Sequence, residues 1–81
     1  MSKLPNLYFL RIDNDYLEDA KAFNTKTGAV AYFRRTAQEL AQYGQECSAT
    51  IHIAPRPDDV AEYPDFVLSL GSRGGVHIER A

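Results

Sequence analysis

Two histidines, a glutamate and a serine are the residues of this chain whose chemistry could serve catalysis or metal binding. His77 and Glu79 are two positions apart, which puts both side chains on one face of a β-strand. His52 falls on the polar face of another predicted strand, so all three would form a metal site if the two strands were neighbours. The sequence has no compact metal-ligand motif, and isolated histidines on exposed strand faces commonly bind nothing. We therefore predict neither a metal site nor a cofactor.

Ser69 would lie opposite His77 if Leu70 pairs with Val76 across a hairpin, and a serine beside a histidine is one element of nucleophilic catalysis. Catalysis also needs an orienting carboxylate and donors aimed at the oxyanion. Glu79 would point parallel to His77, and a flat outer sheet face offers no pocket that excludes water. The sequence thus favours a cross-strand polar pair. A small metal-dependent or hydrolytic enzyme is the third-ranked hypothesis.

Arginines and a tyrosine form the predicted contact set for a partner. Arg34 and Arg35 directly precede the predicted start of a helix, where they can hold a phosphate or a carboxylate. The glycines of a phosphate-binding loop are absent, which argues against a nucleotide site. Tyr32 adjoins the pair, and Arg73 stands in the glycine-rich loop 71–75. Arginine and tyrosine carry a large share of the energy of protein interfaces.

Nucleic acid is the second-ranked partner. Tyr32 and Phe33 stand beside two cations, as aromatic residues do in proteins that bind single strands. Residues 28–33 lack the alternating aromatics of the RNA-recognition sheet motif. The net charge of −2 also argues against a generally basic nucleic-acid binder.

Length and composition indicate one ordinary globular domain over residues 1–81, with 44% hydrophobic and 25% charged residues. Cys47 is the single cysteine, so an internal disulfide is excluded and a cytoplasmic location is favoured. The longest apolar run, residues 29–33, is far shorter than the roughly 20 residues of a membrane helix. We expect no membrane partner.

Hydrophobic patterning predicts strands at 7–12 and 48–54, and hairpins at 20–24/29–33 and 66–70/76–78. The first hairpin would turn at Thr25–Gly28. A helix is predicted over 37–43, because Thr36 and Glu39 fit a capping box and Gly44 suits the residue after the helix. The predicted core is apolar throughout: Leu10, Ile12, Phe23, Val30, Leu40, Ile51, Ile53, Phe66, Leu68, Leu70, Val76 and Ile78.

These elements predict a small α+β fold in the order β-β-β-α-β-β-β. A mostly antiparallel sheet of about six strands, with two hairpins, would pack on one short helix. The functional hypothesis is a non-enzymatic binding or regulatory protein that acts through protein–protein contacts, by analogy with small bacterial or phage accessory proteins. An edge strand could also support a homodimer.

Overall fold

One helix lies across one face of an antiparallel sheet in the computed structural model, which describes residues 6–12, 20–71 and 74–81. The elements are β1 (Leu7–Ile12), β2 (Lys21–Phe23), α1 (Lys26–Ala41), β3 (Ser48–Ala54), β4 (Phe66–Leu70) and β5 (Val76–Arg80). A single 3-10 turn at Pro57–Asp59 interrupts the loop between β3 and β4. The broad α+β prediction is confirmed.

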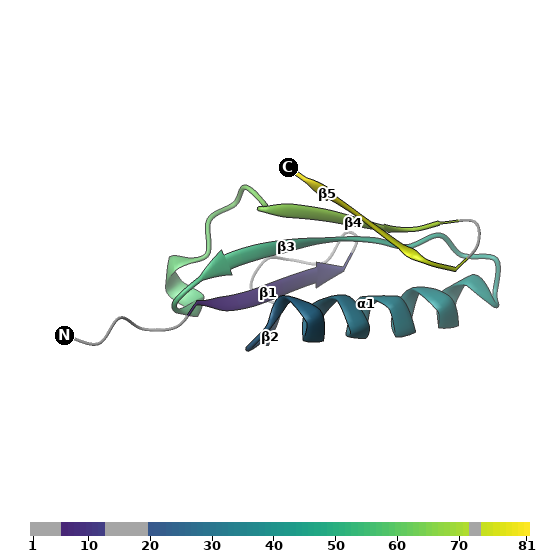
Figure 1. Ribbon diagram of the computed structural model, residues 1–81, viewed down its shortest axis with the longest axis horizontal. Coiled ribbons are helices and arrows are strands. Elements are labelled where there is room, and N and C mark those ends of the chain that lie inside the picture. Colours follow the sequence, from purple (N-terminus) through teal and green to yellow (C-terminus); the bar gives the residue numbers. More distant parts are fainter. Residues whose placement is uncertain (1–5, 13–19, 72–73) are drawn as a thin grey trace.

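The described strands form one sheet in the order β2-β1-β3-β4-β5, and every neighbouring pair is antiparallel (Figure 1). Strand β1 pairs with β3, which follows it only after α1. The second predicted hairpin is present as β4 and β5, with Leu70 opposite Val76 as expected. The sheet has five strands where about six were predicted, and the element order is β-β-α-β-β-β.

The predicted hairpin over 20–33 is wrong in its second half, because residues from Lys26 onward are helical. Thr25 caps this helix: its Oγ1 accepts a hydrogen bond of 3.0 Å from the Gly28 N–H. Ala29, Phe33 and Ala37 are spaced by four residues and are all buried, so they form one stripe on the helix. The short apolar run at 29–33 fits strand and helix periods equally well, and the four-residue spacing continues only in the helix.

The prediction of Thr36 as the helix N-cap is wrong, because Thr36 lies in the middle of α1. The predicted helix over 37–43 is thus the second half of a longer one. The prediction for Gly44 is confirmed, since its φ of 74° is a left-handed conformation that favours glycine. Gly44 N–H donates to Ala41 O (3.0 Å) and Gln45 N–H donates to Leu40 O (3.1 Å), the bond pair of a Schellman motif.

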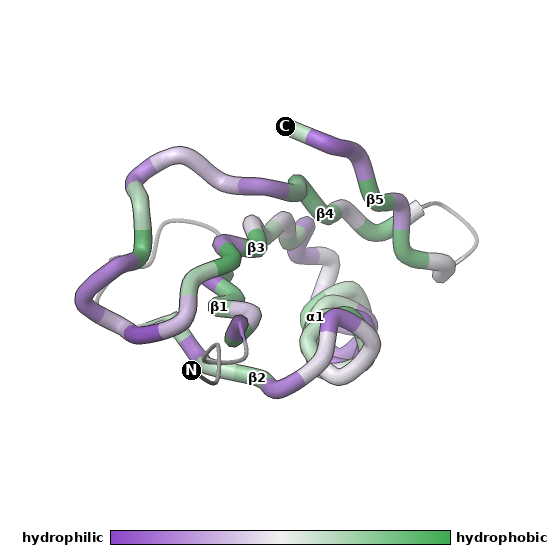
Figure 2. Tube along the Cα trace, turned by 60° about the vertical axis from the view of Figure 1, so that its left-hand side comes forward, coloured by the Kyte–Doolittle hydropathy of each residue, from purple (hydrophilic) through white to green (hydrophobic). Residues whose placement is uncertain are grey.

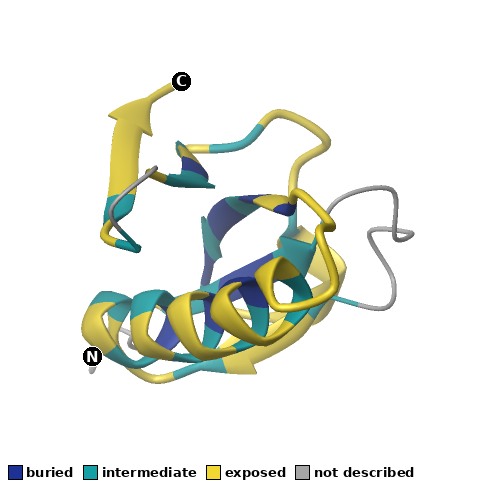
Figure 3. Cartoon of the chain, turned by 90° about the vertical axis from the view of Figure 1, so that its right-hand side faces the viewer, coloured by how far each residue is buried: buried dark blue, intermediate teal, exposed yellow. Residues whose placement is uncertain are grey.

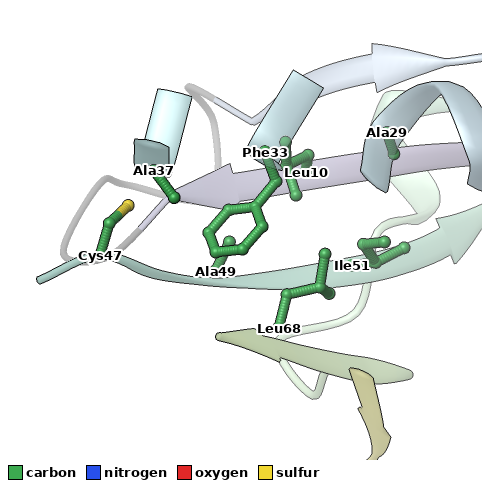
Figure 4. Packing of buried hydrophobic residues seen from close by; sticks show 8 residues of the cluster. All are labelled: Leu10, Ala29, Phe33, Ala37, Cys47, Ala49, Ile51 and Leu68. Atoms are coloured by element: carbon green, nitrogen blue, oxygen red, sulfur yellow. The ribbon is translucent and has the colours of Figure 1, made fainter. Parts of the chain in front are cut away.

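The core lies between α1 and the central strands. Phe33, 0% exposed, projects from the helix onto side chains of β1, β3 and β4 (Figure 4). The buried cluster consists of Leu10, Ala29, Phe33, Ala37, Cys47, Ala49, Ile51 and Leu68. Figure 2 shows apolar colour on the central strands and mostly hydrophilic colour along the loop 55–65. Most predicted core residues contribute, but Ile78 is 36% exposed and that assignment is wrong.

Burial falls off toward β5. Figure 3 shows β5 largely exposed, like the outer surface of α1, whereas the central strands are buried. No helix in the described part of the chain combines the length and the apolar character needed to cross a bilayer.

Candidate functional site: a groove between α1 and β5

Strand β5 ends the described sheet and leaves one of its edges open. Gly71 N–H donates to Gly75 O at 2.7 Å, and Ala81 N–H donates to Asp65 O at 3.2 Å. In an antiparallel ladder every second residue bonds to the same neighbour. The backbone groups of Val76, Ile78 and Arg80 therefore face away from β4, and no other described strand pairs with them.

A groove runs between this edge strand and the N-terminal half of α1. Its volume is about 360 Å³, and its lining consists of Lys26, Thr27, Val30, Ala31, Arg34 and Ile78. Val30 and Ile78 supply apolar surface, while Lys26 and Arg34 supply positive charge. These two residues are eight positions apart on α1, so the charges are spread along the groove rather than concentrated at one point.

Nearby residues strengthen the positive character of the groove. The Lys26 Nζ atom lies 4.1 Å from the centre of the Phe66 ring, which holds the ammonium group by a cation–π contact. Arg80 is directly opposite Phe66 in the β4–β5 ladder, so its side chain starts on the same face of the sheet. Residues 20–38 contain four Lys and Arg residues and no Asp or Glu. The groove is thus basic although the whole chain is acidic.

The structure separates the residues that the sequence grouped as one contact set. At about 100° per residue, side chains two positions apart on a helix face different ways. Arg34 lines the groove, whereas Tyr32 packs against Phe23 at 5.5 Å between ring centres. Arg35 is exposed on α1 and does not line the groove. Arg73 lies outside the described residues.

The electrostatic argument for Arg34 and Arg35 also changes. Both lie inside α1 and not before its N-terminus, so the first-turn N–H groups do not act on them. Arg34 lines the groove because Ile78 of strand β5 lies on its other side. No pattern among the sequence neighbours of Arg34 predicts this proximity.

The two histidines lie apart, because β4 separates β3 from β5. The prediction of His52 on a solvent face is wrong, since it is 1% exposed. Its Nδ1 lies 2.9 Å from Ala61 O and its Nε2 lies 3.0 Å from Thr50 Oγ1. A carbonyl only accepts, so Nδ1 carries a proton and donates to Ala61 O, and Nε2 shares a second hydrogen bond with the Thr50 hydroxyl. His52 thereby fastens the loop 55–65 to the sheet.

His77 and Glu79 do make a contact, with Nε2 and Oε1 3.0 Å apart. They share one face of the strand, as predicted. Ser69 is the cross-strand neighbour of His77, as predicted. The imidazole and the carboxylate are exposed to 64% and 70%, so water screens their interaction. Among the described residues, no group of three metal-ligating side chains comes together.

Asp65 has a role that the sequence analysis missed. Its carboxylate accepts a 2.7 Å hydrogen bond from Ile53 N–H, and its own N–H donates to Ile51 O at 2.8 Å. Asp65 thus makes two hydrogen bonds to β3 just before β4 begins. Asp65 directly precedes the strand predicted at 66–70, and an aspartate at a strand end often bonds to nearby backbone N–H groups. This is the sequence feature that could have indicated its role.

A larger cavity of about 710 Å³ lies at the other end of α1. Gln38 Nε2 donates to Gly74 O at 3.0 Å there and joins the helix to the β4–β5 hairpin. Glu46 is the single charged side chain in its described lining. The α1–β5 groove combines two positive side chains, Lys26 and Arg34, with an apolar surface, and we therefore take it as the candidate site.

Comparison with protein-family models finds none that matches this sequence. Comparisons with curated proteins and with solved structures also find no significant match. A function for this chain must therefore be inferred from its own geometry.

Proposed function

We propose that this chain is a non-enzymatic binding protein whose α1–β5 groove holds an acidic, partly apolar segment of another protein. The observation that carries the proposal is the groove lining, in which Lys26 and Arg34 flank the apolar Val30 and Ile78. A carboxylate can accept two parallel hydrogen bonds from the Arg34 guanidinium, while an apolar side chain of the same segment covers Val30 and Ile78. The sequence-based expectation of a cytoplasmic accessory protein is part of this proposal.

A protein segment suits the groove better than a single-stranded nucleic acid does. Bases need aromatic faces on which to stack, and none of the described residues that line the groove is aromatic. Tyr32 packs on the β2 side, where Lys21 Nζ lies 4.5 Å from its ring centre. The basic segment 20–38 still attracts phosphates, so nucleic acid is the alternative that the experiment must exclude.

The chain supplies a matched pair of variants for the test, because Arg34 and Arg35 are adjacent, exposed and on the same helix. Only Arg34 lines the groove. We would measure fluorescence anisotropy with short labelled peptides in which leucine alternates with glutamate, glutamine or lysine. The glutamate series should bind best. Arg34→Glu should weaken that binding at least about tenfold, since losing one charge-assisted contact and adding a like charge both act against it.

Arg35→Glu should leave peptide binding nearly unchanged, and circular dichroism should show both variants folded. Equal losses in both variants would mean that general charge, and not the groove, holds the peptide. Labelled oligothymidylate and oligouridylate form the nucleic-acid arm. If an oligonucleotide binds more tightly than every peptide, with affinity falling steeply in salt, the protein-binding proposal is wrong and the alternative takes its place.

A further inference from the structure

The open edge of β5 has neither a proline nor a bulge, two features that commonly prevent strand addition. Natural edge strands are often protected by a proline, a bulge or a row of lysines. Strand β5 has the sequence Val-His-Ile-Glu-Arg, and its five residues pair with β4 in an unbroken register. Ile78, at the middle of the strand, is 36% exposed.

The backbone of this edge is complementary to a second copy of itself. Val76, Ile78 and Arg80 direct their N–H and C=O groups outward. If two β5 strands run antiparallel and are centred on Ile78, Ile78 faces its own counterpart. Val76 then faces Arg80 of the second copy. Every outward N–H and C=O of the strand obtains a partner in both copies.

The side chains on the other face select this same register. His77 lies opposite Glu79 of the second copy, and Glu79 lies opposite the second His77. Sliding the strands by two residues in one direction would place His77 opposite His77. Sliding them in the other direction would place Glu79 opposite Glu79. Opposite charges facing each other stabilise a strand pair and like charges destabilise it.

We infer that this chain forms a homodimer through antiparallel pairing of β5 with β5, centred on Ile78. The two sheets become one continuous sheet, and a two-fold axis perpendicular to it places both α1 helices on the same face. Both α1–β5 grooves then lie on that face beside the axis. One short strand from each copy buries little area, so the association is weak and the dimer forms at high protein concentration. Ile78 belongs both to the groove lining and to the centre of the strand pair. Arg34 takes no part in the strand pairing, so Arg34→Glu tests the groove and should leave the dimer unchanged.

Sedimentation velocity of the full chain over a concentration series tests this pairing. Ile78→Pro removes an N–H that faces away from β4, so the β4–β5 ladder keeps its hydrogen bonds. The variant loses the same central bond from both copies, and its dimer dissociation constant should rise at least about thirtyfold. Ile78→Val keeps the N–H and the β-branched shape, and it should change the constant by less than about threefold.

A charge-exchange pair tests the register and separates it from general destabilisation. His77→Glu alone makes two glutamates face each other across the interface, and Glu79→Lys alone places a lysine opposite His77 of the second copy. Each variant should dimerise about three- to tenfold more weakly at low salt, because both symmetric contacts change. An equimolar mixture should regain dimer, since the glutamate introduced in one variant then faces the lysine introduced in the other.

A chain that stays monomeric at every concentration would overturn the inference. So would a dimer that both Ile78→Pro and the single charge variants leave intact, because that dimer would use another surface. If circular dichroism shows that Ile78→Pro does not fold, the mixing experiment decides: a mixture that dimerises no better than its two components contradicts the register.

Discussion

The two faces of the sheet are closed by different physical means. Helix α1 covers one face with apolar side chains, and Phe33, Ile51 and Leu68 there are 0% exposed. The loop 55–65 covers part of the other face, where His52 is buried through hydrogen bonds to Ala61 and Thr50. Phe9, the cross-strand neighbour of His52, is buried on this second face as well.

One face is therefore covered by apolar packing, and the other is covered in part by a loop that hydrogen bonds hold in place. Apolar burial is nondirectional and scales with the area removed from water, so the helix-covered face needs apolar side chains that fill its volume rather than partners at particular atoms. A buried imidazole needs specific partners at specific atoms. The first face should therefore dominate the free energy of unfolding, and the second should fix the position of one loop.

The largest expected effect contrasts two neighbours on β4. Leu68 is fully buried under α1, whereas Val67 on the opposite face is 39% exposed. Leu68→Ala should lower the free energy of unfolding by about 2–5 kcal/mol, because it leaves a cavity in the core. Val67→Ala should cost less than about 1 kcal/mol, since its side chain is already partly in water. Urea denaturation measures both, and equal costs would contradict the assigned faces.

The next effect concerns the hydrogen-bonded face. His52→Ala should cost about 1–3 kcal/mol, because the Ala61 carbonyl and the Thr50 hydroxyl lose their buried partner. His77→Ala is the matched control on the exposed side of β5 and should cost less than about 0.5 kcal/mol. Hydrogen exchange should also show faster exchange in the loop 55–65 of the His52 variant. Unchanged protection there would mean that the imidazole does not hold the loop.

The smallest effect tests where the covering helix begins. Thr25→Ala removes the acceptor of the Gly28 N–H and should cost about 1 kcal/mol. Thr36→Ala replaces a residue inside α1 with the best helix former, so we expect a change below about 0.5 kcal/mol. Thermal unfolding compares the two variants. A larger loss for Thr36→Ala would support the helix start that the sequence alone predicts.

The helix start shows how far local patterns can be trusted. The prediction for Gly44 is correct, because a positive φ after a helix strongly favours glycine. Thr25 and Thr36 are both followed by residues compatible with a helix, and Thr36 has the glutamate of a capping box. The packing of Ala29 and Phe33 against the sheet decides in favour of Thr25, and this contact is remote in sequence.

The candidate site was predictable only in part. Residue type and sequence neighbours single out Arg34, yet its position in the groove depends on Ile78, a residue 44 positions away. The sequence pattern groups Tyr32 with Arg34 because the two residues are close together in the chain. A helix directs the two side chains to different flanks.

Local sequence patterns suffice to predict that antiparallel strands dominate, that β4 and β5 form a hairpin, and that Ile51 and Leu68 are buried. These features follow from alternation, turn residues and hydrophobicity, which act over a few residues. Tertiary contacts were needed to establish that residues 26–33 are helical, that His52 is buried, and that β5 is an open edge beside a basic groove. Each of these depends on which distant segment lies alongside, and local preferences are too weak to decide that.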